Sequence, residues 1–340
     1  MRFSSISRPL CCAAVGLAAC SGDEGPTGPE PAAGPCLLAP SCSSRLEVAP
    51  DRWVRVLRTH DLDAGAPAIT HAVVLVHGSG RNAGFNFNTG VRLTAEPSLR
   101  AAVAIVAPLF VTTAEDPLPD EPFWSSGGWK RGNLSVRGGP VPRVSSYEVL
   151  DTIVARLSDP LRFPDMREIV VAGHSAGGQV AHRYAAGGMN PLGVHVRYVV
   201  ANPSSYLFLG PERPDGAGGF DIPTLASCPD YQQWHYGLQD LNTYMRRIAP
   251  SALPTRLTTR LTTREVTIMV GDQDTGESQL DVRCGANLQG EHRLARGLNL
   301  LAYMDAFHAG HAHVGIVIPG VGHSSRGMFL SPRGRAALLP

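Results

Sequence analysis

Six short, uninterrupted apolar runs restrict the possible folds of this 340-residue chain more than any other feature. They occupy residues 73–76, 103–106, 169–172, 199–200, 266–270 and 316–318. Valine and isoleucine dominate them, and several of the segments between them have helical apolar spacing. Strands that are apolar on both faces and separated by helices are typical of a parallel sheet covered on both sides. We therefore predict an α/β fold with a mostly parallel central sheet from about residue 45 onward.

The helices carry their own start signals. Ser145 and Glu148 have the spacing of a capping box and precede an amphipathic stretch. A second helix is expected from Ser175 to about residue 188, and a third over about 291–307. The segment 203–263 lies between two predicted strands and is too long for a simple crossover, so we interpret it as an insertion, part helix and part loop.

A five-residue motif stands between the run 169–172 and the second helix. It reads Gly173-His174-Ser175-Ala176-Gly177 and matches G-x-S-x-G. This pattern alone occurs often by chance, but its position after a buried strand and before a helix is the setting that a nucleophilic serine turn requires. We expect Ser175 at the apex of a strained turn, with the glycines at 173 and 177 avoiding collisions with the neighbouring strand and helix.

Three further segments end predicted strands with polar residues: 73–80 (VVLVHGSG), 270–274 (VGDQD) and 319–324 (PGVGHS). Together with the serine motif, they resemble the α/β-hydrolase superfamily, and the likeness covers most of residues 70–325. Serine, acid and histidine come in the chain order that this superfamily uses. The resemblance implies an α/β-hydrolase fold with the insertion between the strands near 200 and 266.

The resemblance also implies residue roles. Ser175 would be the nucleophile and His323 the base, while Asp274 matches the G-x-x-D spacing of the acid and Asp272 is the alternative. The backbone N–H groups of Ser79 and Ala176 would form the oxyanion hole. No cofactor is required by this chemistry.

The expected substrates are small carboxylic esters with short or medium acyl, aryl or sugar groups. An amidase or peptidase with the same triad is the alternative, as is a catalytically silent, surface-tethered binding protein. Trp124, Trp129, Tyr231 and Trp234 would either line the substrate pocket or pack the insertion onto the sheet.

No metal site is expected, although His308, His311 and His313 lie close together in the sequence. His308 falls near the end of a predicted helix, where imidazole can bind the last carbonyl groups. The formal net charge of +1 gives no electrostatic reason to expect a nucleic-acid partner.

The N-terminus predicts export. Arg2 and Arg8 precede a short apolar stretch at residues 10–19, and the sequence Leu17-Ala18-Ala19-Cys20 resembles a bacterial lipoprotein signal. We expect a signal peptide at 1–19, a lipid-modified Cys20, a flexible tether at 20–44 rich in Pro and Gly, and a catalytic domain at 45–340. The lipid would hold the protein on the bacterial envelope, with the outer membrane favoured and simple secretion as the alternative.

Four cysteines remain after Cys11, Cys12 and Cys20 are assigned to the signal and the lipid site. An even number suits disulfides in an oxidising compartment, and three pairings are possible. We favour Cys36 with Cys42, which are close in sequence, and Cys228 with Cys284. The second bridge would fasten the insertion to the loop after the predicted acid.

Overall fold

The computed structural model describes residues 34–189, 191–224, 226, 228–248 and 253–340. Its main sheet has eight strands in the spatial order β1-β2-β4-β3-β5-β6-β9-β10. These strands are β1 (Ser43–Ala49), β2 (Arg52–Arg58), β3 (His71–Val76), β4 (Val103–Pro108), β5 (Glu168–His174), β6 (His195–Ala201), β9 (Val266–Gly271) and β10 (His313–Ile318). Each of the six predicted runs lies in one of these strands.

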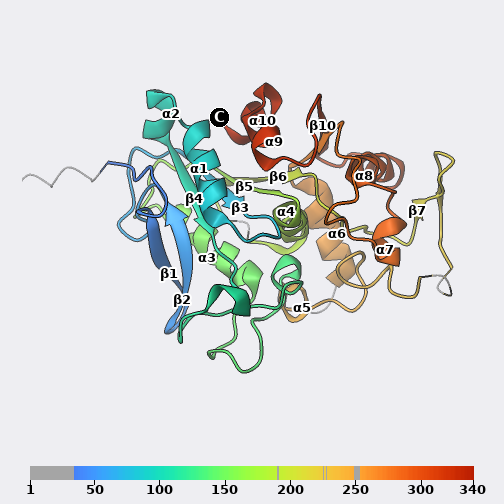
Figure 1. Ribbon diagram of the computed structural model, residues 1–340, viewed down its shortest axis with the longest axis horizontal. Coiled ribbons are helices and arrows are strands. Elements are labelled where there is room, and N and C mark those ends of the chain that lie inside the picture. The colour runs from blue at the N-terminus through green and yellow to red at the C-terminus, as the bar shows by residue number, and fades with distance from the viewer. Residues whose placement is uncertain (1–33, 190, 225, 227, 249–252) are drawn as a thin grey trace, which may run out of the picture. The chain divides into compact units, whose positions relative to one another are not determined.

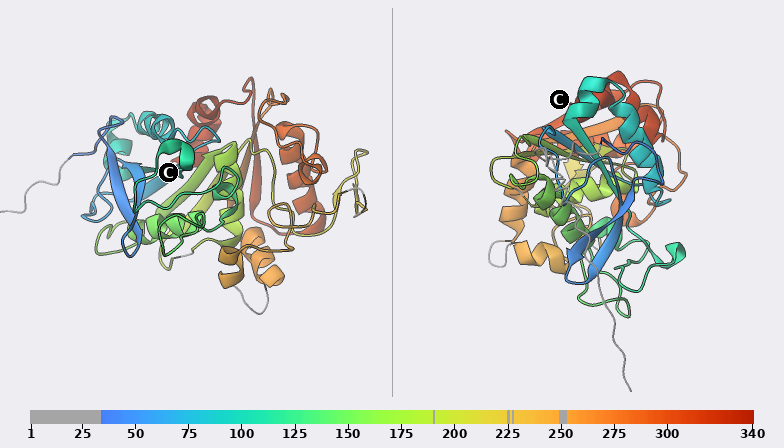
Figure 2. Two further views of the ribbon diagram at one scale, coloured as in Figure 1. Left: turned by 60° about the horizontal axis from the view of Figure 1, so that its bottom comes forward. Right: turned by 90° about the vertical axis from the view of Figure 1, so that its left-hand side faces the viewer.

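The strands from β4 to β10 in that order pair in parallel, whereas β1 pairs antiparallel with β2 and β2 antiparallel with β4. Figure 2 shows the antiparallel hairpin of β1 and β2 at one edge of the sheet. Because the central strands are parallel, their carboxyl ends meet at one edge, and open α/β sheets build their sites there.

Helices cover both faces of the sheet, as predicted (Figure 1). One face carries α1 (Ala83–Leu93), α2 (Pro97–Ala102), α9 (Ser325–Leu330) and α10 (Pro332–Leu338), and the other carries α3 (Ser146–Leu157), α4 (Ala176–Gly187), α6 (Leu253–Thr263) and α8 (Arg293–Phe307). Alternate residues of β3 show the two layers: Val73 and Leu75 join one apolar cluster, and Val74 and Val76 join the other. Both faces of the strand are therefore buried, which explains its uninterrupted apolar sequence.

The predicted capping box starts α3. The Ser145 hydroxyl accepts a hydrogen bond from the Tyr147 N–H at 3.1 Å, and the Glu148 carboxylate accepts one from the Ser145 N–H at 2.6 Å. The helices expected near 175–188 and 291–307 are α4 and α8, each within two residues of the predicted bounds.

The insertion lies between β6 and β9 and is part helix and part loop, as predicted. It contains the short hairpin of β7 (Arg213–Pro214) and β8 (Phe220–Asp221), then α5 (Thr243–Ile248) and α6. The Trp234 indole and the Asn242 amide both donate to the Arg131 carbonyl, at 2.9 and 2.5 Å. These bonds tie the insertion to the irregular segment around the short 3₁₀ turn η2 (Trp129–Arg131).

The described part of the chain begins after the predicted signal peptide, so Cys20 and the first half of the tether lie outside it. Residues 36–44, predicted as the end of the tether, pack against the sheet instead. Cys42 is 4% exposed, and the Cys36 N–H donates to the Thr59 carbonyl. The Cys36–Cys42 disulfide closes this segment, which explains why a stretch without secondary-structure signals is held in place. Among the described residues, no helix has the length and apolarity needed to cross a membrane.

Candidate active site

Ser175 occupies a strained turn between β5 and α4. Its φ of 57° and ψ of −119° lie in a region that non-glycine residues rarely adopt. Its N–H donates to the Ala201 carbonyl at the end of β6. The surrounding sheet therefore holds the serine in its unusual conformation at the start of a helix.

The glycines of the motif are required by close backbone contacts. A Cβ atom on Gly173 would lie 2.2 Å from the carbonyl carbon of Gly177, and one on Gly177 would lie 2.1 Å from the Val76 carbonyl oxygen of β3. Both separations are impossible for real atoms, so β5, α4 and β3 can approach this closely only without side chains. The sequence prediction for these positions is confirmed.

Three residues from three loops form a hydrogen-bonded chain. The His323 Nε2 atom lies 3.0 Å from the Ser175 hydroxyl, and its Nδ1 atom lies 2.7 Å from the Asp274 carboxylate. The Asp274 side chain is 1% exposed, whereas that of His323 is 29% exposed and faces the solvent side. Since the carboxylate accepts from Nδ1–H, Nε2 is left to accept the serine proton.

Asp272, the alternative acid, is placed elsewhere. Its carboxylate accepts from the Gly320 N–H at 2.7 Å, two residues after β10 ends. It thus holds the base of the loop that carries His323 without contacting the imidazole ring.

A buried arginine supports the acid. Arg293, the first residue of α8, donates to Asp274 at 3.4 Å and to the Ser278 carbonyl at 2.8 Å. The side chains of Arg293 and Asp274 are each 1% exposed. The carboxylate therefore has a cation on one side and His323 on the other. These two partners stabilise its negative charge, which is buried away from water. Sequence reasoning missed Arg293, because it lies 19 positions from Asp274 and in no motif.

Asn202, also missed, joins the loops that carry Asp274 and His323. It is fully buried, with a φ of 45°, directly after β6. Its side-chain oxygen accepts from the Gly271 N–H at 2.9 Å, and its side-chain N–H donates to the Gly322 carbonyl at 3.3 Å. The end of β9 and the residue before His323 are thus fixed relative to each other.

Both residues predicted as oxyanion donors are next to a residue of the serine turn or belong to it. Ala176 follows it at the first position of α4, and Gly78, before Ser79, is near enough that a Cβ atom there would lie 3.9 Å from the Ser175 Cβ. In the part of the chain that the structure describes, neither amide N–H donates to another protein group. Both remain available to a substrate oxygen.

His77 shapes the loop of Ser79. Its Nε2 accepts from the Phe110 N–H at 3.0 Å, so its Nδ1 carries the proton and donates to the Gly78 carbonyl at 2.9 Å. Burial lowers the pKa of His77 to about 4, so the ring stays neutral. His77 is therefore a structural residue here.

His174 packs against the catalytic histidine, with ring centroids 4.4 Å apart. Burial, and then the positive charges of His323 and Arg293, lower its pKa well below the ordinary value. A neutral ring at this position supports His323 without repelling its protonated form.

A polar cavity lies beside this site. It has a volume of about 260 Å³ and is lined by side chains from the segment before α3, from α4, from the insertion and from the loop after β9. The four aromatic residues considered for a pocket do not line it. Trp124, Trp129 and Tyr231 are at most 1% exposed and pack in the interior, while Trp234 bonds to the Arg131 carbonyl. Their alternative role, packing, is the one observed.

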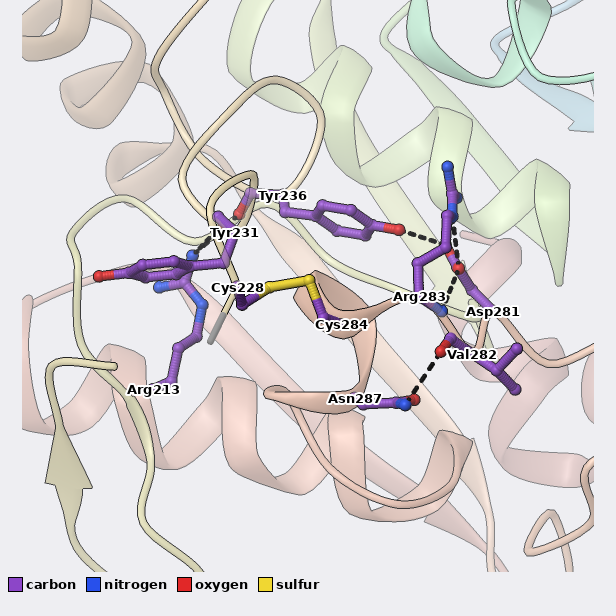
Figure 3. The surroundings of a disulfide bond; sticks show 9 residues. All are labelled: Arg213, Cys228, Tyr231, Tyr236, Asp281, Val282, Arg283, Cys284 and Asn287. Atoms are coloured by element: carbon purple, nitrogen blue, oxygen red, sulfur yellow. Dashed lines mark hydrogen bonds and ion pairs between the residues drawn. A yellow bond between two sulfur atoms is a disulfide. The ribbon is translucent and has the colours of Figure 1, made fainter. Parts of the chain in front are cut away.

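The Cys228–Cys284 disulfide is present as predicted (Figure 3). Cys284 starts the short helix α7 (Cys284–Asn287), directly after Arg283. Arg283 pairs with Asp281, which also accepts from the Tyr236 hydroxyl of the insertion at 2.7 Å. The disulfide and these bonds therefore fasten the insertion to one wall of the cavity.

The histidines near the C-terminus have local partners. His308 caps α8 and approaches the Tyr303 hydroxyl at 3.3 Å, and His311 approaches Asp305 at 3.1 Å. His313 begins β10, at the opposite end of the strand from the His323 loop. Within the described ranges, no three His, Cys, Asp or Glu side chains converge as a metal site would require.

Comparisons with known proteins find likeness in structure only. No family model and no curated protein matches the sequence. Poly(aspartic acid) hydrolase-1 from Sphingomonas sp. KT-1 superposes with a TM-score of 0.62 at 22% identity, over 87% of this chain and 97% of that one. A poly(3-hydroxybutyrate) depolymerase from Bordetella parapertussis superposes with a TM-score of 0.59 at 21% identity, over 87% of this chain and 94% of that one. The chain thus has the α/β-hydrolase fold.

Proposed function

We propose that this protein is a serine hydrolase of carboxylic esters. The observation that carries the proposal is the hydrogen-bonded chain from Ser175 through His323 to the buried Asp274. A strained serine at a helix start, a histidine whose Nε2 atom faces the hydroxyl and a buried carboxylate are the parts that nucleophilic acyl transfer needs. Two solved structures with this fold are named as hydrolytic enzymes. Poly(3-hydroxybutyrate) is a polyester, which agrees with this class, whereas poly(aspartic acid) is a polyamide, which is the bond type of the amidase alternative.

The reaction follows from the geometry. His323 Nε2 removes the proton as the Ser175 oxygen attacks the ester carbonyl carbon. The N–H groups of Ser79 and Ala176 bind the oxygen that becomes negative, and each such donor contributes about 3 kcal/mol to the barrier reduction. His323 then gives its proton to the departing alcohol. Water attacks the acyl-serine with the same histidine as base, so one ester and one water yield one acid and one alcohol.

The substrate class is tested with a panel of 4-nitrophenyl esters of increasing acyl length, beside the matching anilides. We expect kcat/KM to peak at short or medium chains, because the cavity is small and polar. A steady rise toward long chains with activation at an oil–water interface would identify a lipase. Faster hydrolysis of the anilides would identify the amidase alternative.

We also propose that the mature protein is exported and held on the bacterial envelope by a lipid on Cys20. Two disulfides, typical of exported proteins, support export. Mass spectrometry of the membrane fraction should find a diacylglyceryl-modified Cys20 at the N-terminus, absent from a Cys20→Ser variant. A soluble wild-type protein with an unmodified N-terminus would contradict the anchor.

A further inference from the structure

The cavity beside the triad is rich in positive charge. Lys130, Arg131 and Arg283 line it, and Asp281 is the acidic residue among the side chains that form its wall. Asp281 is already engaged, since it accepts two hydrogen bonds from Arg283, at 2.8 and 2.5 Å. Lys130 and Arg131 form no ion pair with it, so this one carboxylate faces three cationic side chains.

Neither of those two side chains has an anionic partner in the described residues. The Lys130 Nζ lies 5.8 Å from the centre of the Trp129 ring, and the structure gives it no hydrogen bond or ion pair. The guanidinium of Arg131 makes none either, although its backbone carbonyl accepts from the insertion. Both side chains are half-buried. Unpaired cations in partly desolvated positions are costly unless a ligand compensates them.

A further, buried cation adds to the positive electrostatic potential of the cavity. Arg183 of α4 is fully buried, and its bonds go to neutral acceptors, including the Lys130 and His235 carbonyls and the Ser205 hydroxyl. Burial, followed by the charges of Arg183 and Arg131, lowers the pKa of Lys130. Burial, followed by the charge of Arg283, lowers that of Arg131. An anion in the cavity would relieve these repulsions.

Two of the residues that line the cavity connect it to the region of Ser175. Gln179, which lines it, lies four residues after Ser175 on α4, a rise of about 6 Å along the helix axis. Gln279, on the opposite wall, accepts from the Ser79 hydroxyl at 2.5 Å and so touches the predicted oxyanion loop. A substrate whose ester bond lies at Ser175 is therefore close enough to place a second group in this cavity.

We propose that this cavity recognises a carboxylate on the substrate, so that the preferred substrates are esters that carry a free carboxylate near the scissile bond. Lys130 and Arg131 provide the charge, because a guanidinium matches the two oxygens of a carboxylate and a lysine adds a point charge. Gln179 and Ser204 add neutral polar side chains to the lining. This proposal rests on the proposed ester hydrolysis and adds its substrate class.

Two matched substrate pairs test it, because the carboxylate can belong to either side of the ester. The acyl pair is 4-nitrophenyl hexanoate and the 4-nitrophenyl monoester of adipic acid. The alcohol pair is phenyl butyrate and 3-carboxyphenyl butyrate. For at least one pair, Lys130→Met and Arg131→Met should each lower kcat/KM for the charged member by about 10- to 100-fold and leave the neutral member unchanged. Comparing each variant with the wild type cancels the intrinsic reactivity of the esters.

Arg137→Met is the matched control. Arg137 is exposed and lies outside this cavity, so its loss removes the same charge from the same segment without changing the proposed contacts. It should leave both members of each pair unaffected. A further test uses the wild-type protein and so does not depend on whether a variant folds. Raising the salt concentration from 0.01 to 1 M shortens the Debye length from about 30 to about 3 Å, and it should selectively lower kcat/KM for the charged ester.

The outcomes separate the two proposals. Hydrolysis of the neutral esters with no selective loss for either charged ester in Lys130→Met and Arg131→Met would overturn carboxylate recognition and leave the esterase standing. An equal loss with Arg137→Met would also overturn it, since long-range charge would then explain the preference. A folded wild type that hydrolyses none of the four esters would overturn the proposed function itself.

Discussion

Asn202 shows how a single side chain positions the catalytic loops. It accepts from Gly271 at the end of β9 and donates to Gly322 beside His323. Its positive φ is tolerated by asparagine better than by most residues. The residue therefore combines an unusual backbone with two buried hydrogen bonds, and its effect on chemistry would pass through the position of His323.

We predict that Asn202→Asp slows turnover while affecting substrate binding little. Aspartate keeps the oxygen that accepts from Gly271 but turns the donor to Gly322 into a second oxygen facing a carbonyl. This change should raise the activation free energy by about 1–3 kcal/mol and so lower kcat by about 10- to 100-fold. Steady-state kinetics should show the loss in kcat with KM nearly constant. Unchanged kcat in a folded variant would show that this bond does not position His323.

Among the structural elements, the Cys228–Cys284 bridge joins the insertion to the segment that follows β9, where hydrogen bonds such as that of Tyr236 to Asp281 also connect the two. The two cysteines are 56 residues apart in sequence. One belongs to the insertion, and the other follows the cavity residues Asp281 and Arg283 and starts α7 (Figure 3). The bridge restricts the unfolded chain and also positions the Arg283 wall.

Replacing both cysteines by serine should lower the free energy of unfolding by about 2–4 kcal/mol. Equilibrium urea unfolding of the double variant measures this, with the Cys36→Ser/Cys42→Ser variant as a comparison. The shorter Cys36–Cys42 loop, with a separation of 6, should contribute less. Equal losses from the two pairs would contradict the loop-length argument.

The elements that the sequence predicts best are those with local signals. Every central strand appears as an apolar run because both of its faces are buried, and the serine turn appears because Gly173 and Gly177 have no space for a side chain. Arg293 and Lys130 carry no such signal. Their roles depend on which distant segments pack beside them, and a charged residue in a helix or loop is ordinarily exposed.

The aromatic residues show what the sequence does not predict. The sequence left open whether Trp124 and Trp129 line a pocket or pack the insertion onto the sheet, because it does not specify in which direction a ring points. The structure buries both in the interior next to Phe110, and the wall of the cavity is charged instead. The direction of an aromatic side chain depends on tertiary packing, which cannot be deduced from the number of aromatic residues in a segment.

Across the whole molecule, several buried histidines make stability depend on pH. Burial lowers the pKa of His77 to about 4 and that of His313 to about 3, from an ordinary value of 6.5, and it also lowers those of His174, His182 and His235. These rings are neutral in the folded protein but become protonated below pH 6.5 when the chain unfolds. The unfolded state then binds more protons, so acid favours unfolding.

We therefore predict that the contribution of these histidines to the free energy of unfolding is complete above pH 6.5. It should decline as the pH falls from 6.5 toward 4. Each such histidine contributes a slope of up to about 1.4 kcal/mol per pH unit in that window. Urea unfolding at pH 8, 6.5, 5 and 4 measures the slope. His77→Asn and His313→Asn should each reduce it, and a stability that is flat or rises on acidification would contradict the assignment of neutral buried rings.

Reaction with a fluorophosphonate probe tests most directly whether Ser175 is an activated nucleophile. We expect a single covalent adduct on the peptide that contains Ser175, found by mass spectrometry of the folded wild-type protein. The adduct should be absent from Ser175→Ala and strongly reduced in His323→Ala, because the hydroxyl reacts only when His323 accepts its proton. A folded wild-type protein that remains unlabelled, or one labelled equally after Ser175→Ala, would contradict it.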